Sequence, residues 1–270
     1  MSLRIQNNVE AFNAQRQLLS NSDKLSKAME KLSSGYRINR AGDDAAGLAI
    51  SEKLRGQIGG LGQASRNASD AISMVQTAEG ALNEVHSMLQ RVRELAVQYK
   101  NGTLSSNDQL AIQSEVDQLK AEIGRIGTDT EFNGIKLLSG ANPTISFQVG
   151  SGDTQQITVA TISVGAQVVS TVFALSSSST QTDIQQIDDA INNISAARAT
   201  FGAVQNRLEH TVANLASYQE NLTASESRIR DADMASEMVQ FTKLQILQQA
   251  GTSMLSQANQ APQSVLSLLR

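Results

Sequence analysis

The stretch IDDAINNISAARATFGAVQNRLEHTVANLASYQENLTASESRI, residues 187–229, decides the fold of this chain. A bulky apolar side chain recurs at every seventh position of this stretch, at Ile187, Ile194, Phe201, Leu208, Leu215, Leu222 and Ile229. A seven-residue repeat of this length predicts a rod-like helix, about 63 Å long, that packs along one seam. The intermediate seam positions are only partly apolar, and Arg198 occupies one of them. The seam therefore needs other helices to cover it.

The first half of the chain contains two stretches that match this rod. The first stretch has two columns of apolar residues at seven-residue spacing, namely Val75, Leu82, Leu89 and Ala96, and Ala78, Val85, Val92 and Tyr99. The second stretch steps by four and three residues, through Ile112, Val116, Leu119, Ile123 and Ile126. Asn101-Gly102 breaks the chain between them. We predict a mainly α protein, a long antiparallel helical bundle closed by the C-terminal rod.

The middle of the chain has a different composition, because charged residues become rare between residues 128 and 179. The β-rich runs 144–149 and 156–159 are separated by Gly150-Ser151-Gly152-Asp153, which suits a hairpin loop. Asn133-Gly134 marks a further turn. We predict a small β-hairpin patch here, and a chain that reverses so that its N- and C-termini pair.

Both ends of the chain are predicted to be amphipathic helices. The N-terminal end has an apolar stripe at Ile5, Val9, Phe12 and Leu19, which continues one residue out of phase at Leu18, Leu25 and Leu32. The C-terminal end has no charged residue between Lys243 and Arg270. Because a helix exposed to water normally carries charges, we expect neighbouring subunits to bury this tail; docking on its own domain is the alternative. Both ends are expected to be largely disordered in isolation and to fold on assembly.

Composition excludes several classes of function. The balance of 22 basic to 26 acidic residues, net charge −4, offers no basic field for nucleic acid. Cysteine is absent, and no run of apolar residues is long enough for insertion into a membrane. The first 20 residues lack the apolar core and cleavage pattern of a secretory signal peptide. We therefore expect any export to proceed without cleavage of a signal.

No motif predicts a catalytic, cofactor-binding or metal site. Asp43 and Asp44 could form a carboxylate pair, but no third ligand lies nearby in sequence, and we expect a cap or a polar loop between two helical segments. The glycines between residues 56 and 62 lack the Lys-Ser or Lys-Thr of a phosphate loop. His86 and His210 have no zinc-binding spacing around them. We expect a protein that is not an enzyme and has no cofactor.

Four segments resemble the bacterial flagellins. These segments are LSSGYRINRAGDDAAGLAISEKLRGQI at 32–58, LQRVRELAVQ at 89–98, FNGIKLL at 132–138 and QILQQAGTSMLSQANQAPQSVLSLLR at 245–270. The resemblance covers the chain except roughly residues 140–182. The chain is similar to a short flagellin that lacks the large variable outer domains of bigger relatives.

The resemblance implies a structural subunit that self-assembles into the helical filament of the bacterial flagellum. Residues 1–44 and 230–270 would form the terminal coiled coil of an inner tube, and residues 45–229 an outer-tube bundle with its β patch at about 130–180. The implied inner-tube residues are Ile5, Val9, Phe12, Leu19, Leu25, Leu32, Phe241, Leu244, Leu247, Met254 and Leu255. The bundle seam would comprise Val75, Leu82 and Leu89 with the seven residues of the rod. A hook–filament junction or other flagellar accessory protein is the alternative.

The resemblance also implies where this protein works and what it meets. Flagellin-like subunits leave the cell by the flagellar type III route and reach the extracellular filament. The implied partners are further copies of the same chain, an export chaperone, the filament cap and the hook-junction proteins.

One segment predicts a second kind of interaction. Arg91 and Leu95 are four residues apart and share a helix face with Met88, which we place beside the core columns and not within them. An exposed Arg flanked by apolar side chains is typical of an interface anchor. In flagellins that this chain resembles, the matching segment and a Glu that aligns with Glu115 are recognised by the vertebrate flagellin-sensing Toll-like receptor. We therefore expect Arg91, Leu95 and Glu115 to be recognised in the released monomer.

Overall fold

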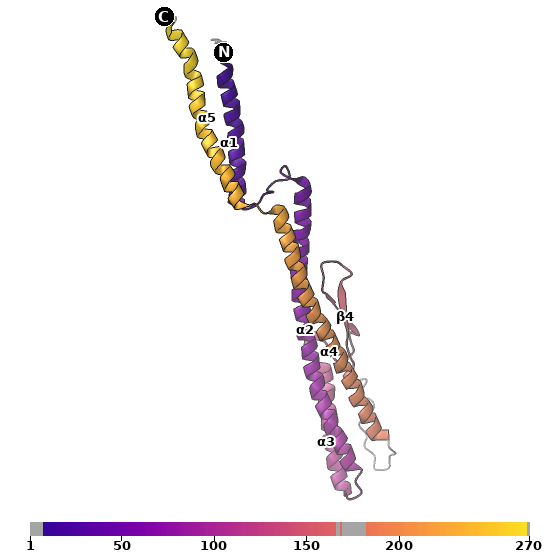
Figure 1. The fold of residues 1–270 in the computed structure, drawn as a ribbon. Coiled ribbons are helices and arrows are strands. Elements are labelled where there is room, and N and C mark those ends of the chain that lie inside the picture. The colour runs from indigo at the N-terminus through magenta and orange to yellow at the C-terminus, as the bar shows by residue number, and fades with distance from the viewer. Residues whose placement is uncertain (1–7, 166–167, 169–181, 269–270) are drawn as a thin grey trace. The chain divides into compact units, whose positions relative to one another are not determined.

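The computed structural model describes residues 8–165, 168 and 182–268, and the fold is mainly helical (Figure 1). Its helices are α1 Val9–Ser34, α2 Ala45–Tyr99, α3 Ser106–Asp129, α4 Thr182–Arg230 and α5 Met234–Leu268. Its strands are β1 Glu131–Phe132, β2 Ile135–Lys136, β3 Thr144–Gln148 and β4 Gln156–Ala160. The predicted fold class is confirmed: long helices, a small antiparallel β patch and paired terminal helices. None of the described helices has the length and apolar content needed to cross a membrane.

The chain divides into two compact units. One comprises Met1–Gly56 and Asn221–Arg270, and the other comprises Gln57–Glu220. We call these the terminal unit and the central unit. Helices α2 and α4 each contribute residues to both units.

The central unit is an antiparallel bundle of α2, α3 and α4 around one apolar core. The α2 columns at Val75, Leu82 and Leu89 are buried, as the seven-residue spacing predicts. The rod residues from Ile187 to Leu215 are buried too, whereas Leu222 and Ile229 belong to the terminal unit and are half-buried. Each large side chain buried in this seam stabilises the fold by about 1.5–3 kcal/mol.

Two ion pairs between α2 and α4 show that these helices run antiparallel. Arg93 Nε lies 2.6 Å from Asp188 Oδ1, and Arg198 Nη2 lies 3.6 Å from Glu79 Oε1. As the residue number rises along α2 it therefore falls along α4. Arg198, the charged position of the predicted seam, is thus accommodated at the edge of the core by a carboxylate on α2.

The β patch packs against the bundle. Strands β3 and β4 pair antiparallel with Ile145 opposite Val159, and the buried Ile157 and Val159 alternate with exposed residues along β4. Val149 and Ile157 pack with Leu208 of α4 and with alanines of α2. The predicted hairpin is therefore confirmed, although the end of the predicted patch, 169–180, lies outside the described residues.

A shorter hairpin precedes the β3–β4 hairpin. It pairs β1 with β2 around Asn133 and Gly134, whose φ angles of 50° and 77° are the left-handed values that this tight turn requires. The turn predicted from this dipeptide is confirmed.

Helix α3 begins with a capping box. The Ser105 hydroxyl accepts a hydrogen bond from the Asp108 N–H, and the Asp108 carboxylate accepts hydrogen bonds from the Ser105 N–H at 3.1 Å and the Ser105 hydroxyl at 2.7 Å. These donors stabilise the ionised carboxylate and lower the pKa of Asp108 below its ordinary 3.8. The start of α3 therefore depends on a charged side chain.

This cap gives the fold a defined pH dependence. Because the pKa is lower in the folded state, the stabilisation is complete above 3.8 and is lost as the pH falls through the lowered value. The variant Asp108→Asn, which cannot ionise, should melt below the wild type at neutral pH, and the gap should shrink in acid. Thermal unfolding followed by circular dichroism across this pH range measures the gap. A gap that stays constant with pH would contradict the proposed role of the charge.

Candidate functional site

The candidate functional site is the pair of terminal helices, α1 and α5, which lie side by side and antiparallel (Figure 1). Asn8 Nδ2 donates to the Ala258 carbonyl at 2.7 Å, and Asn21 Nδ2 donates to the Leu244 carbonyl at 2.9 Å. Near the other end, Lys31 Nζ lies 4.0 Å from Glu237 Oε1. These contacts run in opposite directions along the two helices and set their register.

One apolar seam joins the two helices. Its buried or half-buried residues include Leu18, Leu25, Ala28, Leu32, Phe241, Leu244 and Leu255. The helices approach closely at Gly251, where a Cβ would lie 3.1 Å from Leu18 Cδ1. A larger residue at this position would force Leu18 to move.

A second apolar face on the same helices remains uncovered within the described chain. On α1 it comprises Val9, Phe12 and Leu19, and on α5 it comprises Val239, Ile246, Leu247 and Met254. Phe12 is 66% exposed and Val239 is 71% exposed, and exposed fractions this high are more typical of polar side chains. Exposed apolar residues concentrated in this way mark an interaction surface.

The structure divides the predicted inner-tube residues between these two faces. The predicted residues half-buried in the seam are Leu25, Leu32, Phe241, Leu244 and Leu255. Those on the exposed face are Val9, Phe12, Leu19, Leu247 and Met254. Ile5 lies outside the described residues.

Two faces explain why the N-terminal stripe changes phase. Leu19 belongs to the exposed face and Leu18 to the seam, so the sequence contains two stripes and not one stripe that shifts. Val239 and Ile246 of the exposed face were not predicted from the sequence. Their seven-residue spacing, like that of Leu247 and Met254, is the signal that could have found them.

Several hydroxyl groups of α5 bond within their own helix. Thr242 Oγ1 donates to the Met238 carbonyl at 2.8 Å, and Ser253 Oγ donates to the Gln249 carbonyl at 3.1 Å. Glu237 and Lys243 are the only charged residues in the α5 sequence. Dehydration of this surface would bury few charges, and these hydroxyls already have hydrogen-bond partners.

Two connecting segments of the terminal unit meet around Arg230. One joins α1 to α2 and the other joins α4 to α5, and we call them the α1–α2 crossing and the α4–α5 crossing. Its guanidinium carbon lies 4.8 Å from the centroid of the Tyr36 ring, and Nη1 lies 2.6 Å from Glu52 Oε1. Its own carbonyl accepts from the Arg37 N–H at 2.7 Å, while the Ala232 N–H donates to the Gly35 carbonyl at 2.9 Å. A side chain only 12% exposed thus ties the α1–α2 crossing to the α4–α5 crossing.

The structure bears out the prediction of a cap or polar loop for Asp43 and Asp44: Asp44 caps a helix and Asp43 lies in a loop. Asp44 Oδ1 accepts the Gly47 N–H at 2.8 Å, in the first turn of α2. Asp43 Oδ2 accepts the N–H groups of Arg40 and Asn39, and these bonds lower the pKa of the Asp43 carboxyl. Among the described residues, no group of three or more His, Cys, Asp or Glu could hold a metal ion.

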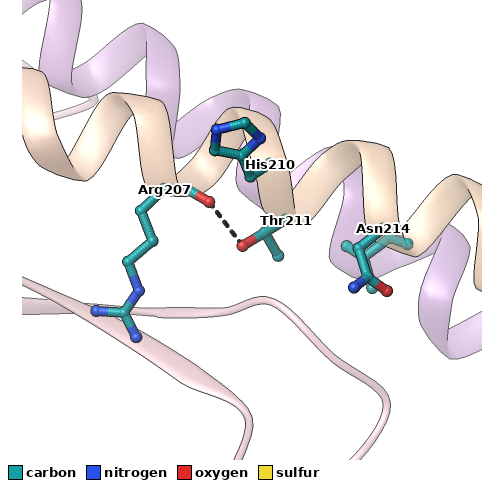
Figure 2. A pocket seen from close by; sticks show the side chains of 5 residues that line it. Arg207, His210, Thr211 and Asn214 are labelled. Atoms are coloured by element: carbon teal, nitrogen blue, oxygen red, sulfur yellow. Dashed lines mark hydrogen bonds between the residues drawn. The ribbon is translucent and has the colours of Figure 1, made fainter.

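A depression of about 560 Å³ on α4 is lined by Arg207, His210, Thr211, Asn214 and Leu215. Figure 2 shows Arg207 extending away from the helix while the Thr211 hydroxyl donates to the Arg207 carbonyl, at 2.8 Å. The described lining residues include no carboxylate that could pair with His210 as an acid or base. The depression is therefore a surface feature of the bundle without an arrangement for catalysis.

The predicted receptor-recognition residues lie in two different environments. Arg91 and Glu115 are exposed and form an ion pair between α2 and α3, with Arg91 Nε 2.9 Å from Glu115 Oε1. The hydrogen bonds with Glu115 and then Glu94 raise the pKa of the Arg91 guanidinium. Glu115 thus holds Arg91 in a defined position on the surface.

The prediction that Leu95 lies beside the core is wrong, because Leu95 is only 2% exposed and packs within the core. The reason is a third seven-residue column on α2, comprising Met74, Ala81, Met88 and Leu95, whose members are buried or half-buried. A helix flanked by two helices and a β patch buries a wider arc than a two-helix seam does. The exposed apolar residues of this region are Val97 and Leu110.

Family models match both ends of the chain. The model of the bacterial flagellin N-terminal helical region matches residues 5–143, and that of the C-terminal helical region matches residues 184–269. Flagellin from Halalkalibacterium halodurans is 53% identical over 98% of this chain and 99% of that protein. Flagellin from Bacillus subtilis is 51% identical over 99% of this chain and 100% of that protein.

Solved structures agree with these matches. The crystal structure of Bacillus cereus flagellin has a TM-score of 0.53 and 33% identity, and covers 60% of this chain and 94% of its own. A hook-associated protein from Vibrio parahaemolyticus has a TM-score of 0.59 at 14% identity, over 70% of this chain and 100% of its own. At that identity the likeness concerns the fold alone.

The Arg230 contacts can be tested by substitution. Arg230→Gln should lose the cation–π contact with Tyr36 and the ion pair with Glu52, and weaken the crossing by about 1–2 kcal/mol. Hydrogen exchange at the Arg37 and Ala232 amides should then be roughly tenfold faster. Arg228→Gln is the matched control, because Arg228 is exposed and bonds to Ser225 on its own helix. Equal exchange rates in the two variants would contradict the role assigned to Arg230.

Proposed function

This chain belongs to the bacterial flagellin family, and on that premise we propose that it is the subunit that self-assembles into the helical filament of the bacterial flagellum. The observation that carries the proposal is the exposed apolar face of α1 and α5. A lone subunit leaves Phe12, Val239 and their neighbours in water. Contact with further copies would bury them, at about 25 cal/mol per Å² of apolar area.

We propose the same division of the chain that the sequence predicts. Residues 1–44 and 230–270 form the inner tube of the filament, and residues 45–229 form the outer tube with the β patch. The near absence of charge on α5 supports an inner position, because an unpaired charge buried between subunits would cost several kcal/mol. Both ends are proposed to be largely disordered in the isolated monomer and to fold on assembly.

Export and flagellar partners follow from the same proposal. The subunit travels by the flagellar type III route without a cleaved signal and reaches the extracellular filament. On the way it meets an export chaperone, and in the filament it contacts the cap and the hook-junction proteins. The similarity to the flagellins of Halalkalibacterium halodurans and Bacillus subtilis supports this placement.

A hook–filament junction or other accessory protein is the second candidate. The likeness to the Vibrio parahaemolyticus hook-associated protein favours it only at the level of fold. Such a protein would not extend into long homopolymers. Polymerisation from seeds therefore distinguishes the two candidates.

We further propose that the released monomer is recognised by the vertebrate flagellin-sensing Toll-like receptor. Arg91 and Glu115 carry this proposal, because they are exposed and joined by an ion pair that orients the guanidinium. Leu95 can contribute only by supporting the helix from the core. Charged groups held in place before binding lose less entropy on forming an interface.

Phe12 provides a direct test of the filament proposal. Phe12→Gln should leave the monomer fold unchanged, because the side chain is exposed, and should raise the critical concentration for seeded polymerisation more than tenfold. Sedimentation and negative-stain electron microscopy measure polymer formation. Phe12→Leu, which keeps an apolar side chain, should polymerise nearly as well as wild type. Wild-type protein that stays monomeric beside good seeds would favour the accessory-protein candidate.

Arg91 provides the test of receptor recognition. Arg91→Ala should reduce the potency of pure monomer in a receptor reporter assay by roughly tenfold or more. Arg125→Ala is the matched control, since Arg125 is also exposed and pairs with two carboxylates, Glu122 and Asp129. Leu95→Ala is unsuitable because it would open a cavity in the core. Equal potency of Arg91→Ala and wild type would refute the assignment.

A further inference from the structure

The methionines of this chain are distributed unevenly between its two units. The sequence has seven, and Met1 lies outside the described residues. In the central unit, Met74 is buried in the core and Met88 packs against it. In the terminal unit, Met29, Met234, Met238 and Met254 are all between 46% and 65% exposed. Among the described residues, the exposed thioethers therefore lie on α1 and α5, the helices whose apolar face we propose to be the assembly surface.

Three of these side chains lie at one end of the helix pair. Lys31 of α1 is 4.0 Å from Glu237 of α5, so Met29 and Met238 lie at the same level of the pair. Met234 is one helical turn before Met238 and shares its side of α5. Met254 lies farther along α5, seven residues after the exposed Leu247. Met254 thus lies on the exposed apolar face of the terminal unit, and Met29, Met234 and Met238 are exposed elsewhere on the same two helices.

We propose that Met29, Met234, Met238 and Met254 are oxidation sites through which a peroxide prevents this chain from assembling. The sulfur lone pair attacks one peroxide oxygen, the O–O bond breaks, and the leaving hydroxide takes up the remaining proton as water. The thioether is oxidised by two electrons to a sulfoxide and the peroxide is reduced. Exposure determines which methionines react, so Met74 and Met88 are protected by the core.

The chemical consequence is largest at an interface between copies of the chain, and this part of the inference rests on the proposed filament function. Met is a flexible apolar side chain that fills irregular gaps between packed surfaces. A sulfoxide adds a strong hydrogen-bond acceptor, which is costly to bury without a donor. The Thr242, Thr252 and Ser253 hydroxyls of α5 do not offer such a donor, because each already donates to a carbonyl of its own helix. Oxidised monomer should therefore remain unassembled, and the polymer should shield the same sulfurs.

The experiment treats full-length monomer with graded hydrogen peroxide and maps sulfoxides by peptide mass spectrometry. We expect the four exposed methionines to oxidise well before Met74 and Met88. Removal of the peroxide, followed by seeded polymerisation, should show a critical concentration raised about tenfold or more. Methionine sulfoxide reductases should restore assembly, which separates sulfoxide formation from irreversible damage. Polymer treated in the same way should oxidise more slowly at the four positions.

Matched variants identify the sites responsible. A variant with Leu at positions 29, 234, 238 and 254 keeps apolar side chains of similar volume and should polymerise after peroxide treatment. A variant with Leu at positions 74 and 88 removes the two core thioethers and should remain as sensitive as wild type. Circular dichroism of each treated sample checks that the helices persist.

Several results would overturn the proposal. Oxidation of Met74 and Met88 at the same rate as the other four would contradict the assignment of the sites. Normal assembly of monomer that carries all four sulfoxides, or equal sensitivity of the fourfold Leu variant, would contradict their effect. Untreated wild type that fails to polymerise would contradict the filament function and with it the assembly effect, while the sulfoxide map would still decide the sites.

Discussion

Two packed helices can bury only one stripe of each, and this limit governs the terminal unit. Helices α1 and α5 carry more apolar surface than one seam can hold, so Phe12, Val239 and Ile246 stay exposed after Leu25 and Phe241 are covered. This limit does not apply to the central unit, because three helices and a β-hairpin close around its core. One part of the chain can therefore fold on its own contacts, whereas the other is left with a surface that further copies can complete.

Helix α5 has few charged residues, and this composition suits a helix with an exposed apolar face that other copies can cover. A helix that keeps water on one side can carry Lys and Glu there, and several charged pairs of the central unit are of this exposed kind. On α5, Thr242 and Ser253 bond to carbonyls of their own helix, so their dehydration strands no hydrogen-bonding group. Solubility of the lone helix is reduced by this composition, but its ability to pack against other surfaces is increased.

Seven-residue spacing predicted most of the central fold, because a buried column leaves a direct mark on the sequence. The Val75 and Ile187 columns are buried as expected, and the hairpin follows from its turn residues. Spacing alone could not assign each column to a neighbour. Leu95 belongs to a third column that a two-helix seam would have left exposed, and Leu18 and Leu19 belong to different faces. Which face a stripe packs on depends on how many helices surround it, and that is a tertiary property.

The Arg230 crossing shows why geometry can matter more than burial energy at one position. A Leu or Met at this site would pack against Tyr36, but neither could also bind Glu52. Removing a guanidinium from water is costly, and Arg230 Nε is buried without a hydrogen-bond partner among the described residues, so these contacts bring little net gain in stability. What the contacts provide is a restricted geometry, because a planar cation between an aromatic ring and a carboxylate can adopt few arrangements. The backbone bonds from Arg37 and Ala232 then hold the two crossings in one register.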